Sequence, residues 1–121
     1  KLPALNADLT ALQRRVTMRA EHLPQPRNIG ELIGMLYTIE GSTRGGRFIY
    51  RQLLQTLGES LPLSFFEGYG ANSDLRWQEF WAFADASCHP EEIPDALAAA
   101  VRMFAFFKLH LDRCAVADVE L

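Results

Sequence analysis

Apolar residues recur at helical spacing along most of the chain, and nowhere do they alternate with the period of two that a half-buried strand shows. This pattern predicts helices over residues 6–20, 31–57, 74–86 and 94–113. Residues 63–66 are expected to add one short helical turn. Because short loops join these segments, the sequence predicts an all-α fold, a bundle of helices.

The ends of the predicted helices carry residues that commonly begin and end helices. Asn28 is a suitable N-cap for the long helix, and Glu31, three positions later, forms a capping-box-like pair with it. Gly58 stands where a residue in the left-handed conformation would stop this helix. Asp8 is expected in the opening turn of the first helix, where an acidic side chain complements the helix dipole.

Three of the predicted helices have an apolar face, and the aromatic face of the helix over 74–86 is expected to belong to the core. On the long helix the face comprises Ile29, Leu32, Ile33, Leu36, Tyr37 and Ile39, and continues with Phe48, Ile49, Leu53 and Leu54. On the next helix it comprises Leu75, Trp77, Phe80, Trp81 and Ala84. On the last helix it comprises Leu97, Ala100, Val101, Phe104, Phe107, Lys108 and Leu111.

Three glycines, Gly41, Gly45 and Gly46, lie at the centre of the long helix. Each interior glycine costs about 0.5–1 kcal/mol relative to alanine, so three cost roughly 2–3 kcal/mol. A domain is stable by only about 5–15 kcal/mol, so some other requirement should keep this backbone bare. A second helix crossing tightly against the small residues is one explanation, a flat ligand lying on the exposed backbone is another, and a simple bend is a third.

The composition is that of a globular protein, with 121 residues of which 49% are hydrophobic and 22% charged. The net charge is −3 and there is no basic tract, so neither a nucleic acid nor an anionic membrane surface is expected as a partner. Cys88 and Cys114 lack metal-binding spacing and are expected to be free thiols in a reducing compartment. The chain begins at Lys1 without a methionine, and it shows no signal peptide and no apolar run of membrane-spanning length. The cytoplasm is therefore the expected location.

The segment around the glycines resembles a known family. Residues 37–47 read YTIEGSTRGGR, which is similar to the distal-helix signature of the heme oxygenase family. The match is best to the bacterial branch associated with bacteriophytochromes, whose pattern is roughly Y-x-x-E-G-S-x-x-G-G-R. Phe65 and Phe66, followed by Gly-Tyr-Gly at residues 68–70, resemble the next landmark of that branch. The resemblance extends over about residues 5–111.

The resemblance implies an all-α fold whose central helix is kinked at the glycines over one face of heme. The 121 residues would form a single domain, matching about the C-terminal two thirds of a larger heme oxygenase-like domain. Heme would be both substrate and cofactor, and the complete protein would cleave it oxidatively to biliverdin, CO and iron. An electron donor of unknown identity is implied as a partner, and a homodimer is left open.

The resemblance also assigns roles to single residues. Gly41, Ser42, Gly45 and Gly46 would lie over the distal face of the heme, where bare backbone lets the helix approach the ring. Ser42 stands where some family members have an acidic residue that orders distal water, a role for which a hydroxyl can donate and accept. The residues implied in cofactor binding are Tyr37, Arg44, Phe66, Phe104 and Phe107.

The proximal histidine of the family has no counterpart in this chain. His22, His89 and His110 are expected to be ordinary surface or half-buried histidines, with His110 the best substitute for an axial ligand. No metal ligand is therefore assigned, and the axial histidine is expected outside these 121 residues. The alternative is a truncated, non-enzymatic helical module that binds a partner or dimerises.

Overall fold

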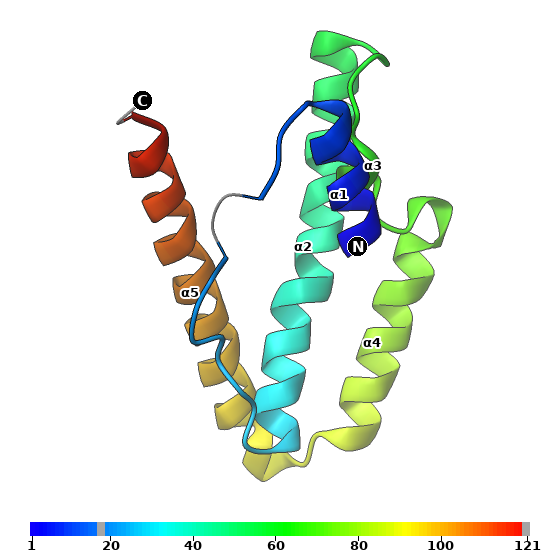
Figure 1. Ribbon diagram of the computed structural model, residues 1–121. Helices are drawn as coiled ribbons and strands as arrows, with labels where there is room; N and C mark the ends of the chain where they lie inside the picture. Colours follow the sequence, from blue (N-terminus) through cyan, green and yellow to red (C-terminus); the bar gives the residue numbers. More distant parts are fainter. Residues whose placement is uncertain (17–18, 120–121) are drawn as a thin grey trace. The chain divides into compact units, whose positions relative to one another are not determined.

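The computed structural model describes residues 1–16 and 19–119. Its helices are α1 (Leu2–Ala11), α2 (Ile29–Leu57), α3 (Ser64–Glu67), α4 (Ser73–Ser87) and α5 (Ile93–Val119), with short 3-10 turns η1 (Gly70–Asn72) and η2 (Pro90–Glu92) (Figure 1). No strand occurs in the described ranges, so the predicted all-α fold is confirmed. No helix among the described residues is both long and apolar enough to cross a membrane.

The chain forms two compact units. The first unit comprises Lys1–Thr17 and Ile39–Trp81, and therefore holds α1, the larger part of α2, α3, η1 and the start of α4. The second unit comprises Met18–Thr38 and Ala82–Leu121, and therefore holds the start of α2, the end of α4, η2 and α5. Within the first unit, α1 packs against α3 (Figure 1).

Most predicted helices are found close to where the sequence placed them. The long helix is confirmed as α2, an unbroken α-helix of 29 residues that continues through all three central glycines. Gly58 follows it with a φ of +81°, which confirms the left-handed stop. The predicted helix over 74–86 is confirmed as α4, and the last helix continues beyond residue 113 to Val119. The two cysteines are free thiols, as expected.

The prediction of a first helix over residues 6–20 is wrong, because α1 begins at Leu2 and ends at Ala11. Gln13 has a φ of +56°, and the Arg14 N–H donates to the Leu9 carbonyl at 2.7 Å. A residue in the left-handed conformation, followed by a backbone hydrogen bond that reaches back five residues, forms the Schellman motif that ends a helix. Since glutamine rather than glycine occupies the left-handed position, the sequence carried no stop signal. Residues 17 and 18 of the predicted helix lie outside the described residues.

The beginning of α2 is held by a buried carboxylate. Asn28 caps the helix as predicted, since its Oδ1 accepts the Glu31 N–H at 2.8 Å. The Glu31 carboxylate accepts the backbone N–H of Arg27 at 2.8 Å, one residue before the cap, so the pair is not a true capping box. Glu31 is 1% exposed and also accepts hydrogen bonds from the guanidinium groups of Arg27 and Arg102. These donors, the Arg27 side chain first, lower the pKa of Glu31 to about 2.

The tight helix crossing in this chain occurs at glycines other than the central three. Within the second unit, a Cβ placed at Gly30 would stand 2.6 Å from the Glu92 carbonyl oxygen, and one at Gly34 would clash with the Ala96 carbonyl oxygen. No side chain fits in either place, so α2 and the start of α5 approach each other through bare backbone. The Thr38 hydroxyl, one turn further along α2, is buried.

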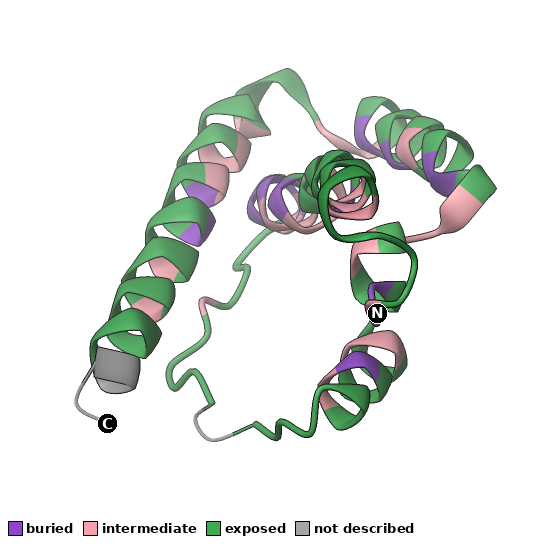
Figure 2. Ribbon diagram, turned by 90° about the horizontal axis from the view of Figure 1, so that it is seen from above, coloured by how far each residue is buried: buried purple, intermediate pink, exposed green. Residues whose placement is uncertain are grey.

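This close approach decides which face of α5 is buried, and that face differs from the apolar stripe that the spacing predicted. The buried residues of α5 are Ala99 and Met103, with Ala96, Ala100 and Phe106 half-buried (Figure 2). The larger residues of the predicted face are exposed instead, namely Leu97, Val101, Phe104, Phe107 and Leu111. The physical reason is that a backbone-to-backbone crossing at glycines admits only small side chains on the partner helix, so the alanine face turns inward.

The predicted faces of α2 and α4 are only partly buried. On α4, Phe80 and Ala84 are buried, whereas Leu75 and Trp81 are exposed. On α2, Ile33 is buried, while Tyr37, Phe48 and Ile49 are exposed. Apolar spacing therefore located these helices correctly but did not identify the residues that form the core.

Candidate functional site

Residues 41–46 form a stretch of α2 in the first unit, here called the glycine segment. No atom lies within 4 Å of a Cβ placed at Gly45, and the residue is exposed. A Cβ at Gly41 would stand 3.7 Å from the Trp77 ring, and one at Gly46 would stand 3.6 Å from the Phe66 carbonyl oxygen, both ordinary contact distances. Packing among the described residues therefore requires glycine at none of the three positions.

Two aromatic residues flank the glycine segment within the first unit. Phe66, on α3, faces Gly46, so the structure brings these two predicted site residues together. Trp77, on α4, lies beside Gly41 and stacks on Phe80 with ring centroids 5.3 Å apart. The sequence placed Trp77 in the core, yet it is only half-buried. Its position beside the glycines depends on how α4 packs, for which the sequence carries no signal.

The polar residues of the glycine segment are already engaged. The Ser42 hydroxyl donates to the Ile39 carbonyl at 2.7 Å, one turn back along α2. The guanidinium of Arg44 lies 3.4 Å from the Asp74 carboxylate, and both side chains are largely exposed. The same guanidinium lies 5.8 Å from the centre of the Trp77 ring, within the range of a cation–π interaction.

The start of the glycine segment is held by a cluster of polar residues. The sequence analysis did not identify this cluster. The Tyr69 hydroxyl donates to Glu40 Oε1 at 3.1 Å, and Lys1 Nζ donates to the Ile39 carbonyl at 3.1 Å. Lys1 also reaches the Thr43 hydroxyl and lies 5.4 Å from the centre of the Tyr69 ring. Partial burial, followed by the charge of Glu40, raises the pKa of Tyr69. The cluster ties α1 and the turn after α3 to α2.

Helix α3, which carries Phe66, is held at both of its ends. Asp8 accepts the Ser64 N–H on Oδ1 at 3.0 Å and the Phe65 N–H on Oδ2 at 2.7 Å. The expectation that Asp8 serves the opening turn of its own helix is therefore wrong, because its buried carboxylate caps α3 instead. Gly68, at the other end, has a φ of +66°, and a Cβ there would stand 2.6 Å from Thr43 Cγ2.

The remaining predicted cofactor-binding residues belong to the second unit. Tyr37 is exposed and lies one turn before Gly41 on α2. Phe104 and Phe107 are exposed on α5. The rings of Phe106 and Phe107 pack edge to face, with their centroids 6.1 Å apart. The structure thus brings only Phe66, Arg44 and the glycine segment together within one unit.

None of the three histidines belongs to the unit that holds the glycine segment. His22 and His89 are exposed, and His110 is half-buried with Nδ1 2.9 Å from the Phe106 carbonyl oxygen. Among the described residues, no group of three or more His, Cys, Asp or Glu side chains is arranged to hold a metal ion. The features of the glycine segment that suit a flat ring are its open backbone and its aromatic flanks.

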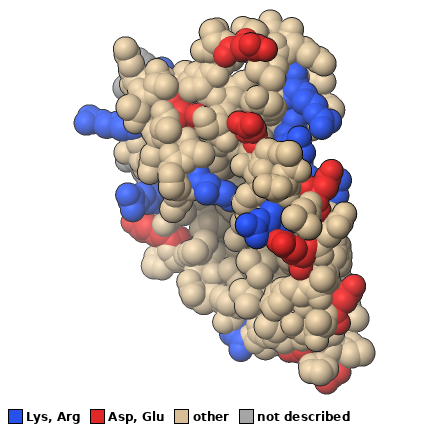
Figure 3. Space-filling view, turned by 90° about the vertical axis from the view of Figure 1, so that its right-hand side faces the viewer, with Lys and Arg blue, Asp and Glu red and all other residues tan. Residues whose placement is uncertain are grey.

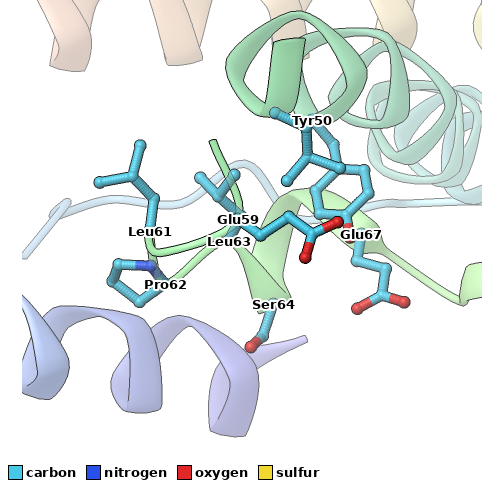
Figure 4. A pocket seen from close by; sticks show the side chains of 8 residues that line it. Tyr50, Glu59, Leu61, Pro62, Leu63, Ser64 and Glu67 are labelled. Atoms are coloured by element: carbon cyan, nitrogen blue, oxygen red, sulfur yellow. The ribbon is translucent and has the colours of Figure 1, made fainter. Parts of the chain in front are cut away.

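The first unit also holds a cavity of about 310 Å³ near the C-terminal end of α2 (Figure 4). Its lining residues are Tyr50, Leu54, Glu59, Leu61, Pro62, Leu63, Ser64 and Glu67. This volume lies at the lower end of the range for ligand pockets, which is about 300–1,000 Å³. The cavity does not include any residue of the glycine segment.

Charged side chains of both signs are interspersed on the face shown in Figure 3. No broad area of that face carries a single sign, in keeping with the net charge of −3. The mixed charges of this face do not favour a polyanionic partner.

Comparison with known proteins gives one informative match. The chain is 34% identical over 122 aligned positions to a protein named heme oxygenase from Xanthomonas campestris pv. campestris (strain 8004). The alignment covers 99% of this chain and 70% of the relative, so both units are included. No family model matches the chain. No solved structure matches it significantly.

Proposed function

The chain belongs to the heme oxygenase family, and from this premise we propose that it serves the oxidative cleavage of heme to biliverdin, CO and iron. The observation that carries the proposal is the open backbone at Gly45, where no atom lies within 4 Å of an added Cβ. A helix that keeps glycine at such a position loses stability without gaining packing. A flat substrate lying on the backbone supplies the missing reason.

The side chains around the glycine segment suit such a substrate. Phe66 at one end and Trp77 at the other offer apolar ring surface on either side of Gly45. Arg44 is exposed enough to exchange its surface pair with Asp74 for a heme propionate, since exposed ion pairs contribute only about 0–1 kcal/mol. Tyr37, Phe104 and Phe107 remain proposed heme-binding residues because of the family resemblance.

Ser42 has a narrower role than the sequence suggested. Its single proton is used in the hydrogen bond to the Ile39 carbonyl. The hydroxyl oxygen is therefore left as an acceptor, and we assign to it the orientation of a water molecule over the glycine segment. Bound heme supplies the oxygen chemistry at its iron, and the protein supplies shape, hydrogen bonds and exclusion of water.

The axial histidine is proposed to come from outside residues 1–121. The proposal rests on the family resemblance, in which the proximal histidine lies upstream of the segment that resembles residues 5–12. The double phenylalanine and the Gly-Tyr-Gly turn support placing the protein in the bacteriophytochrome-associated branch. The non-enzymatic alternative needs a helix packed so tightly that Gly41, Gly45 and Gly46 must be glycine, and a Cβ at each of them would meet only ordinary contacts or open space.

The test is a titration of the full-length protein with hemin, followed by reduction in air. A Soret band at stoichiometric hemin and then the absorbance of biliverdin are expected. The absence of any spectral change at stoichiometric hemin would reject the proposal, and a Soret band without biliverdin would leave a heme-binding protein that is not an oxygenase. A Gly45→Leu variant provides the control, because it keeps the described packing while filling the space over the backbone.

A further inference from the structure

We propose that Asp8 is a positioning residue that sets the place of Phe66 over the glycine segment and thereby the fit of the heme. This inference rests on the proposed function, because it concerns how the same site is shaped. Asp8 does not touch the glycine segment; it acts through α3.

Asp8 holds the N-terminal end of α3. Both carboxylate oxygens of Asp8 are used there, one on the Ser64 N–H at 3.0 Å and one on the Phe65 N–H at 2.7 Å. Asp8 is 6% exposed, and it is the one buried residue of α1. Hydrogen bonds to a charged acceptor are stronger than neutral ones, and more so where water is excluded. The contact of α1 with α3 is therefore centred on this carboxylate.

A close contact between Gly68 and Thr43 holds the C-terminal end of α3. Gly68 packs so closely on Thr43 that a Cβ there would stand 2.6 Å from the Thr43 methyl group. Thr43 is a buried residue of the glycine segment. One end of α3 is thus fixed against α2 itself, and the other end is fixed by Asp8.

Phe66 lies between these two fixed ends of α3. A helix of four residues has too few internal hydrogen bonds to hold its own position, so its place depends on outside contacts. If the Asp8 contact is lost, α3 can turn about its close contact at Gly68, and Phe66 moves relative to Gly46. The Phe66 ring is 3.7 Å from a Cβ placed at Gly46, so a small rotation changes the wall beside the heme.

The experiment uses Asp8→Asn in the full-length protein, which keeps the size of the side chain but leaves only one acceptor oxygen for two N–H groups. Heme binding is expected to weaken about tenfold, the effect of losing one charge-assisted hydrogen bond. The fluorine resonance of a fluorinated phenylalanine at position 66 is expected to shift in the heme-free protein. Thr10→Ala is the matched control, because the Thr10 hydroxyl is exposed and donates to the Asn6 carbonyl within α1, so its loss should change neither quantity.

A second variant keeps the test decisive if Asp8→Asn does not fold. Asp8→Glu retains the charge and both oxygens but is one methylene longer, so it should remain folded and still shift the fluorine resonance of Phe66. A double-mutant cycle with Phe66→Ala tests whether Asp8 acts on heme binding through Phe66. If it does, Asp8→Asn should have no further effect on heme affinity once Phe66 is absent.

The outcomes separate this inference from the proposed function. The positioning role would be overturned if Asp8→Asn weakened heme binding equally with and without Phe66. It would also be overturned if the fluorine resonance of Phe66 did not shift in Asp8→Glu. Failure of the unmodified protein to bind heme would instead reject the proposed function, and the resonance of Phe66 would still report whether Asp8 positions it.

Discussion

Replacing Gly45 by alanine separates the two reasons for which a helix keeps a bare backbone. A glycine needed for packing cannot accept a methyl group without loss of stability. A glycine kept for a ligand can accept one, and only binding suffers. The structure predicts the second behaviour, because an added Cβ at Gly45 has no atom within 4 Å.

The expected size of both effects follows from the surroundings of Gly45. Alanine removes the helix penalty of glycine, so the free energy of unfolding should rise by about 0.5–1 kcal/mol. For a domain of this length that corresponds to a melting temperature higher by about 2–5 °C. The methyl group would project into the space assigned to the heme. Overpacking of this kind costs about 1–3 kcal/mol, so heme affinity should fall about 5- to 150-fold.

The assay pairs a thermal melt of the heme-free protein with a hemin titration followed at the Soret band. Gln55→Ala, at an exposed position further along α2, is the control and should leave heme affinity unchanged. A Gly45→Ala protein that is more stable and binds heme as tightly as the original would refute the reasoning about the bare backbone. A protein that is less stable would show that Gly45 has a packing partner.

Three further predictions concern the second unit. Gly34→Ala should lower the melting temperature, in contrast to Gly45→Ala on the same helix, because its methyl group would clash with the Ala96 carbonyl oxygen; an unchanged melt would contradict the close crossing. Met103→Ala should cost about 2–5 kcal/mol in urea denaturation, since the side chain is 1% exposed; a loss below about 1 kcal/mol would mean that the site is not tightly packed. Glu31 has a folded pKa of about 2, below its usual 4.5, so it stabilises the fold above that usual value and the contribution disappears as the pH falls toward 2. Glu31→Gln should therefore flatten the loss of stability over this acid range, and a pH profile of unfolding identical to that of the original protein would disprove the assignment.

The helices and their caps were predictable because the signals lie within a few residues of one another. Asn28 and Gly58 mark the two ends of α2 in sequence as they do in the structure. The end of α1 is the exception. It too is set by neighbouring residues, but Gln13 takes the left-handed conformation there, and glutamine at this position does not predict a helix end.

The candidate site was predictable only in part. The glycine segment and Phe66 were found by their sequence, and the structure brings them together. Trp77 and Asp8 were misassigned, to the core and to the opening turn of α1, because their roles depend on contacts with helices distant in the sequence. That Ala99 and Met103 are the buried residues of α5 could not be predicted for the same reason.

The sequence by itself determined that this protein is helical, where α2 begins and ends, and that its central glycines need an explanation beyond propensity. The tertiary structure decided which glycines of α2 are needed for packing, namely Gly30 and Gly34, and which face of α5 is buried near them. The physical reason is that hydrogen bonding within a helix joins residues four apart, whereas burial depends on the surface that another segment presents. Two faces of one helix can be equally apolar, and only the partner's shape selects between them.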